Sequence, residues 1–323
     1  MDRFVFFGGK GGVGKTTVAS AYGVQCARDG LETLLVSTDP AHSTSDVFEQ
    51  RFDDDPAPVD GYAGLSAMEL DPDEEVERHM RDIRRAMSDQ VSPAIVNEID
   101  RQIELAHRTP GAYEAALFDR FIDVMRESDD YDRVVFDTSP TGGTLRLLAL
   151  PEFLQSWVER LREKRAASVD LFEKAAVGGS EARATLEDDP IIRRLTERKE
   201  TFEFAGRVLA EQAQFFLVCN PDDLSIAESH RAVEDLREAG LTVGGLVVNK
   251  VAPAPDEGET GTGATYLRER HRAEQARLDR IHAEFDQPVV AVLEQRAGAD
   301  GTALLGALTD ELDLDTAVDP QQA

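Results

Sequence analysis

The stretch from Gly8 to Thr17, written GGKGGVGKTT, constrains the fold of this chain more than any other feature. It contains the pattern G-x-x-x-x-G-K-T, it follows the apolar run RFVFF, and it precedes a segment with helical periodicity. Glycines in such a loop let backbone N–H groups approach phosphate oxygens, and the start of the following helix adds partial positive charge. The stretch therefore predicts a phosphate-binding loop between a buried strand and a helix.

The same loop contains two lysines, whereas phosphate binding requires only one. Lys15 is expected to contact the β- and γ-phosphates of a bound nucleotide, and the hydroxyl of Thr16 is expected to ligate magnesium. Lys10 lies on the outer arm of the loop and is either a solvated lysine or a cation with a separate role. Only six of the 323 residues are lysines, which favours the separate role. The loop residues expected to bind the nucleotide are Gly9, Lys10, Gly11, Gly12, Val13, Gly14, Lys15, Thr16 and Thr17.

Buried strands and helices alternate along the chain. Apolar runs predict strands at residues 3–7, 32–37, 133–136, 214–219, 243–249 and 287–293, and helical periodicity predicts helices at 16–29 and 226–239. This alternation indicates the α/β class, with a doubly wound, mostly parallel sheet of the P-loop NTPase type and helices on both faces.

Two stretches, residues 73–128 and 151–210, show helical periodicity without any strand signal. We therefore expect an inserted α-helical subdomain within a P-loop ATPase domain of residues 1–312. Residues 313–323 are expected to form a disordered acidic tail. The apolar helix faces of the second insert either form the core of the subdomain or bind a hydrophobic partner.

The charge balance is strongly acidic, with 63 Asp and Glu against 35 Lys and Arg and a net charge of −28. Such a surface is typical of proteins from salt-adapted cells, and without a basic stripe it disfavours a nucleic-acid partner. The sequence has no apolar run long enough to span a membrane and no secretory signal, and its two cysteines cannot form a disulfide framework. These features predict a cytoplasmic protein.

Two polar segments follow predicted strands and are candidates for nucleotide switches. In STDPAHSTS, residues 37–45, Asp39 is placed to orient an attacking water, although Asp39 and Ser43 could instead only cap the next helix. In DTSPTGGT, residues 137–144, Asp137 is expected to hold a magnesium-bound water. The residues expected to move when the γ-phosphate leaves are Pro40, His42, Ser43, Thr138, Pro140 and Gly142.

Together, GKGGVGKT, STDPAHS and FDTSPTGGTLRLL resemble the ATPase family of arsenite pumps and of tail-anchored-protein targeting. The segments TPGAYEAALFDRFIDVM, FLVCNPDDLSIAESHRAVEDL and VVNK extend the resemblance. The resemblance implies a homodimer that closes on ATP, with Lys10 reaching the nucleotide of the other subunit. It also places Asn249 at the adenine edge and makes the helical inserts a surface for hydrophobic membrane-protein segments, with a membrane receptor as a possible further partner.

The chain also departs from this family. Targeting members carry a Cys-x-x-Cys pair that shares a zinc ion across the dimer, and this chain has none, so we expect no zinc. Arsenite-binding members need several thiolates, whereas this chain has only Cys26 and Cys219. The resemblance therefore implies a magnesium-dependent ATPase that captures and delivers tail-anchored proteins. The alternatives are the ATPase subunit of an arsenite pump and a membrane-surface organiser of the septum-positioning type.

Overall fold

The computed structural model describes residues 2–38, 43–71, 112–138, 160, 190–256, 258–296, 301–312, 314 and 316. Its centre is an eight-stranded sheet with the order β3-β4-β2-β5-β1-β6-β7-β8, in which only β3 and β4 pair antiparallel. The strands are β1 (Phe4–Gly8), β2 (Thr33–Ser37), β3 (Ala57–Pro58), β4 (Leu65–Glu69), β5 (Arg133–Asp137), β6 (Ala213–Cys219), β7 (Val243–Val251) and β8 (Val289–Glu294). The helices are α1 (Lys15–Arg28), α2 (Ser43–Phe48), α5 (Ala112–Glu127), α9 (Pro190–Glu211), α10 (Asp223–Glu238), α11 (Thr262–Glu284) and α12 (Gly301–Glu311).

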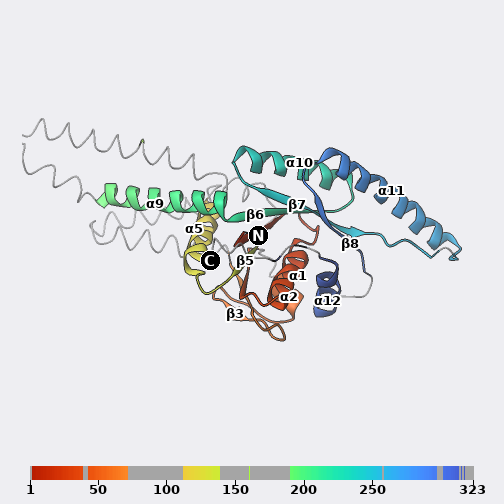
Figure 1. Ribbon diagram of the computed structural model, residues 1–323, viewed down its shortest axis with the longest axis horizontal. Coiled ribbons are helices and arrows are strands. Elements are labelled where there is room, and N and C mark those ends of the chain that lie inside the picture. The colour runs from red at the N-terminus through yellow and green to blue at the C-terminus, as the bar shows by residue number, and fades with distance from the viewer. Residues whose placement is uncertain are drawn as a thin grey trace, which may run out of the picture.

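The alternating side chains of β1 divide the core into two layers. Phe6 stacks between Phe136 and Phe215, with ring centroids 4.5 and 4.7 Å apart, on the face covered by α5, α9, α10 and α11. Phe7 points to the opposite face, where α1, α2 and α12 pack and where its ring lies 5.6 Å from that of Tyr22. Figure 1 shows α10 and α11 on one side of the sheet and α1, α2 and α12 on the other. The predicted α/β class with helices on both faces is confirmed.

Strands β3 and β4 were not predicted from the sequence. β3 contains only Ala57 and Pro58, and β4 reads LSAME, which has no continuous apolar run. β4 nevertheless lies beside β2 in parallel register, and its residues Leu65, Ala67 and Met68 are buried. Tertiary packing at the edge of the sheet decides this strand rather than local propensity.

The structure describes the C-terminal parts of the two predicted helical inserts. Helices α5 and α9 lie in them, and the ring of Phe118 stacks on that of Phe202 with centroids 6.0 Å apart. Phe202, Val208 and Leu209 of α9 are buried in the core of the molecule, so these apolar residues pack within the chain. The remainder of both inserts lies outside the described residues, and the division into domains stays a prediction.

Arg133, at the start of β5, connects the two ends of the described chain. Its side chain is completely buried and donates to the backbone oxygens of Asp2 and Thr316, the latter at 2.9 Å. The hydroxyl of Thr316 also donates to Asp29 at 2.6 Å, and Leu314 is buried. Two residues of the predicted tail thus contact the body of the molecule.

None of the described helices combines the length and the apolar character that crossing a membrane needs.

Candidate nucleotide site

The loop between β1 and α1 places glycines where its backbone requires them. Gly9 has a φ of 143°, and a Cβ there would lie 2.2 Å from the carbonyl oxygen of Val218 in the neighbouring strand β6. Gly14, with a φ of 91°, precedes α1 in the left-handed conformation. The first turn of α1 then directs its N–H groups toward the loop. The strand–loop–helix unit predicted from GGKGGVGKTT is confirmed.

The two lysines of the loop have different surroundings. Lys15 is buried, and its Nζ donates to the carbonyl oxygen of Lys10 at 3.2 Å, so its ammonium lies within the loop. Lys10 is half-buried. Within the part of the chain that the structure describes, its ammonium forms no hydrogen bond or ion pair. The two residues therefore do not share one role in this subunit.

Asp137 ends β5 beside the start of the loop. It lies in register with Phe7 of β1 and with Ser37 of β2, and it is 1% exposed. The hydroxyl of Ser37 donates to Asp137 Oδ2 at 3.3 Å, and the hydroxyl of Thr138 donates to the carbonyl oxygen of Phe7 at 2.9 Å. The structure thus brings the predicted Asp137 and Thr138 to the edge of the sheet that carries the loop. The half-buried hydroxyl of Thr16 and this carboxylate are hard oxygen donors that suit Mg²⁺.

Most of the predicted switch residues cannot be placed. Residues 39–42, which include Asp39, Pro40 and His42, lie outside the described residues, as do Pro140 and Gly142. Ser43 is described and begins α2.

A buried carboxylate that sequence reasoning missed holds the start of α2. Glu69, at the end of β4, is 3% exposed and accepts hydrogen bonds from the backbone N–H and the hydroxyl of Ser45 at 2.9 and 2.8 Å. The helix that follows the Asp39 segment is therefore fixed to the sheet by this carboxylate. The available signal was an acidic residue at the end of a short strand. Using this signal would have required prediction of β4 from the sequence.

Asn249 and Lys250, near the end of β7, contact the loop from the other side. Asn249 Nδ2 donates to the carbonyl oxygen of Val13 at 2.8 Å, and Lys250 Nζ donates to that of Gly12 at 2.6 Å. Sequence reasoning named Asn249 but not Lys250. The scarcity of lysine in this chain could have pointed to it, because Lys250 is one of only six.

The two cysteines are free and lie on opposite faces of the sheet, Cys219 in one core layer and Cys26 in the other. Burial raises the pKa of the Cys26 thiol to about 11 and that of the Cys219 thiol to about 12, so both are protonated at neutral pH. No group of three or more potential metal ligands was found among the described residues. Because the two thiols lie on opposite faces of the sheet, they are not placed to bind one metal ion together.

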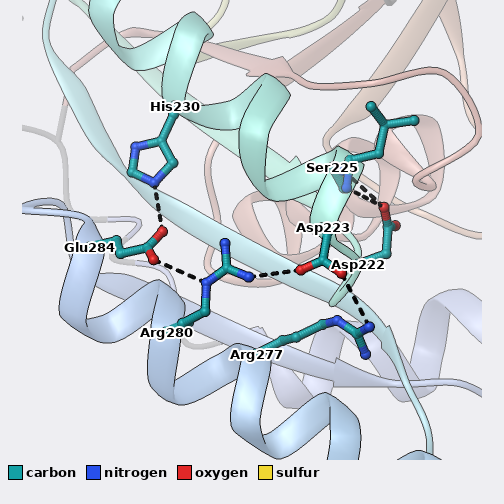
Figure 2. A network of polar contacts seen from close by, with 8 residues as sticks. Asp222, Asp223, Ser225, His230, Arg277, Arg280 and Glu284 are labelled. Carbon is teal, nitrogen blue, oxygen red and sulfur yellow. Dashed lines mark hydrogen bonds and ion pairs between the residues drawn. The ribbon is translucent and has the colours of Figure 1, made fainter.

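A network of charged side chains joins α10 to α11 (Figure 2). Asp223 accepts from Arg280 at 2.7 Å and from Arg277 at 3.3 Å, and Glu284 accepts from Arg280 at 3.0 Å and contacts His230 at 3.1 Å. Hydrogen bonds from Arg280 lower the pKa of both carboxyl groups. This network lies on the sheet face opposite α1 and consists of exposed and half-buried groups that pair with one another (Figure 1).

Comparisons with known proteins agree with this geometry. A family model described as anion-transporting ATPase matches residues 2–313. A relative in Halobacterium salinarum, named for an arsenical pump-driving ATPase, is 34% identical over 92% of this chain, which spans 41% of that relative's length. A relative with the same kind of name in Aquifex aeolicus is 31% identical, with 88% of this chain and 89% of the relative aligned. ATPase GET3A of Arabidopsis thaliana is 32% identical, with 88% of this chain and 76% of the relative aligned.

The family model covers nearly the whole chain, and the glycine-rich loop on which the resemblance rests lies between a buried strand and a helix. The protein is therefore a member of the anion-transporting ATPase family, of the arsenite-pump and GET3 type, and it is an ATPase.

Proposed function

We propose that this ATPase works as a nucleotide-gated homodimer in the cytoplasm and carries hydrophobic membrane-protein segments to a membrane. The observation that carries the proposal is the contrast between the two lysines of the loop. Lys15 is buried against its own loop, whereas the ammonium of Lys10 has no partner among the described residues of its own subunit. A cation in that position is available to a nucleotide held by a second copy.

The chemistry proposed for each subunit is magnesium-dependent hydrolysis of ATP to ADP and phosphate. The backbone N–H groups of the loop and the ammonium of Lys15 bind the phosphates, and the Thr16 hydroxyl and the Asp137 carboxylate are the groups that hold Mg²⁺. The metal, when bound, neutralises charge on the β- and γ-phosphates. Asp39 orients the attacking water, and Asn249 binds the adenine edge.

Lys10 acts across the dimer in this proposal. Negative charge develops on the transferred phosphoryl group, and a cation supplied by the partner stabilises that charge most when the two subunits are closed. Hydrolysis then removes the γ-phosphate and loosens the dimer. Closure and opening of the dimer are transmitted by the switch segments to the helical inserts. Nucleotide state thereby controls the surface that binds hydrophobic membrane-protein segments.

Two other functions fit this chain less well. The names of two relatives favour an arsenical pump-driving ATPase, but Cys26 and Cys219 lie in separate core layers with raised thiol pKa values, so their burial opposes thiolate coordination. A membrane-surface organiser would need a basic amphipathic segment, whereas the C-terminal residues 310–323 are acidic. We therefore place delivery of hydrophobic segments first.

Client capture tests the proposed role. The Asp39→Asn variant is expected to bind ATP and hydrolyse it slowly, which holds the dimer closed. Co-expressed with a tail-anchored protein and purified in molar KCl with ATP, it should retain that protein at about one client per dimer. The control is the same client without its transmembrane segment. Equal recovery of both clients, or of neither, would contradict the carrier function, and arsenite-dependent turnover would then be measured.

A second experiment tests the dimer. Lys10→Ala should reduce turnover by at least about tenfold and weaken ATP-dependent dimerisation, because the partner's nucleotide loses a cation. Light scattering with ATP and phosphate-release rates measure both effects, and Lys199→Ala on α9 is the matched control. Unchanged turnover and unchanged dimerisation in Lys10→Ala would remove the role across the dimer.

A further inference from the structure

Strand β7 departs from regular geometry at Asn249 and Lys250. Its pairing with β8 shifts register between Val248 and Val251, and Lys250 has a φ of 60°. A left-handed backbone is uncommon for a residue other than glycine, and an irregular register re-aims the side chains beside it. Successive side chains of a regular strand point to opposite faces of the sheet, whereas those of Asn249 and Lys250 both reach the phosphate loop.

These two side chains hold two consecutive carbonyl groups of the loop. Asn249 Nδ2 donates to the oxygen of Val13 at 2.8 Å, and Lys250 Nζ donates to the oxygen of Gly12 at 2.6 Å. The backbone N–H of Lys250 also donates to Asn249 Oδ1 at 2.8 Å. Asn249 is 7% exposed, and its amide is held at both its nitrogen and its oxygen. Its orientation is therefore fixed by contacts within the chain.

Space for this contact depends on Gly14. A Cβ at Gly14 would lie 2.5 Å from Asn249 Nδ2 and 3.8 Å from Cε of Lys250. Both side chains thus lie directly over the glycine that precedes Lys15, next to the start of α1. The clamp made by Asn249 and Lys250 is part of the nucleotide site rather than a separate surface contact.

The fixed amide retains hydrogen-bonding capacity that suits adenine. A side-chain amide has two N–H donors and an oxygen with two acceptor sites. The contacts with Val13 and Lys250 use one donor and one acceptor site among the described residues. The remaining N–H and lone pair match N7 and the N6 amino group of adenine, whereas guanine presents the acceptor O6 in place of N6. An amide that cannot rotate therefore selects adenine over guanine.

We propose that Lys250 is a nucleotide-positioning residue, which fixes the loop against β7 through the Gly12 carbonyl so that the Asn249 amide faces the base of bound ATP. The inference rests on the nucleotide site proposed above and adds to it the residue that positions the base-binding amide. Three of the six lysines of the chain, Lys10, Lys15 and Lys250, contact or belong to this loop. Strained backbone positions of this kind persist where surrounding contacts fix them, and they cluster at ligand sites.

The test compares nucleotides that differ in the base. Lys250→Met removes the ammonium and keeps most of the side-chain stem, and Lys199→Met on α9 is the control for loss of one positive charge. Dissociation constants are measured with Mg²⁺ for ATP, GTP and inorganic tripolyphosphate, which has no base. In Lys250→Met the dissociation constant of ATP should rise about tenfold and the preference for ATP over GTP should fall, while the dissociation constant of tripolyphosphate should rise by a clearly smaller factor.

A role that is only electrostatic or structural gives a different pattern. An equal loss for ATP and tripolyphosphate, or an unchanged ratio of ATP to GTP affinity, would overturn the proposal. If Lys250→Met does not fold, Lys250→Arg provides the same comparison, because arginine keeps the charge but donates with a different geometry. The proposal then requires a reduced ATP preference with unchanged tripolyphosphate binding. Failure of the wild-type protein to bind ATP would instead refute the nucleotide site itself.

Discussion

The carboxyl edge of the sheet and the surface between α10 and α11 use charged residues in opposite ways. At the edge, Lys15, Glu69 and Asp137 are 7%, 3% and 1% exposed, and their contacts include backbone groups and hydroxyls. At the α10–α11 surface, Asp223 and Arg280 are exposed and contact other charged side chains (Figure 2). In a chain with 63 acidic residues, burial and the chemical nature of the partner separate the charges that serve the site from those that only keep a face solvated.

Of the substitutions that test this contrast, Asp137→Asn should have the largest effect, and it should act on the rate of ATP hydrolysis. The amide keeps the shape of the carboxylate but loses the charge proposed to hold Mg²⁺, so ATP hydrolysis should fall by at least about a hundredfold. Steady-state phosphate release measures the effect, and circular dichroism checks that the variant is folded. Asp223→Asn at the α10–α11 surface makes the same chemical change and should leave turnover unaltered. Retention of more than half the activity in Asp137→Asn would contradict the assignment.

Glu69→Ala should lower the free energy of unfolding by about 2–3 kcal/mol. The substitution leaves the backbone N–H and hydroxyl of Ser45 without their buried acceptor. Urea denaturation measures the change, and Glu69→Gln, which keeps one acceptor oxygen, should lose less. A variant as stable as the wild-type protein would mean that water replaces the carboxylate, so this part of the edge would behave like the outer surface.

The two buried thiols should make the free energy of unfolding depend on pH in the alkaline range, unlike the exposed carboxylates of the α10–α11 surface. Their pKa values rise on folding from 9.0 to about 11 for Cys26 and about 12 for Cys219, so above pH 9 the unfolded chain releases protons that the folded chain retains. Stability should therefore fall as pH rises through this range, by about 1 kcal/mol for each thiol at pH 10. Urea denaturation of the Cys26→Ala and Cys219→Ala variants between pH 8 and pH 10 measures it as a shallower decline. A decline as steep as in the wild-type protein would show that the thiols have the same pKa in the folded and unfolded states.

Substitutions at the α10–α11 surface should have the smallest effect on stability. The pKa values of Asp223 and Glu284 are lowered by Arg280, so their ion pairs stabilise the fold above the usual carboxyl range, and this contribution is lost as pH falls through the lowered values. A double-mutant cycle with Asp223→Asn and Arg280→Gln should give a coupling that is measurable at low salt near neutral pH and disappears in molar KCl. A coupling that persists in molar KCl would mean that this surface is not solvated as described.

Much of the fold could be predicted because its signals are local. The loop GGKGGVGKTT, the apolar run VVF before Asp137 and the helical pattern near residues 226–239 each depend on residues close together in the sequence. β5 and α10 confirm two of these predictions to within a few residues at each end. β4 escaped prediction because its apolar residues are separated by Ser66 and its burial depends on pairing with β2.

The missed parts of the site depend on contacts between distant residues. Lys250 reaches Gly12 across 238 positions, and it does so only because of its left-handed backbone and the shift in register at the end of β7. Glu69 reaches Ser45 only because β4 ends beside β2. The residue types could have drawn attention to Glu69 and Lys250, but they do not reveal which distant groups these side chains contact. Individual side chains could therefore be assigned where a motif fixed their position, and not where the fold brought them together.

The guanidinium of Arg133 has a consequence for the mechanical resistance of the molecule. It binds the backbone at Asp2, before β1, and at Thr316, after α12, so one buried side chain joins the beginning and the end of the described chain. A pulling force applied between the two ends would act on this side chain before it reached the hydrogen-bond ladder of β1. Replacement of Arg133 would transfer the load directly to β1, the strand from which the phosphate loop continues.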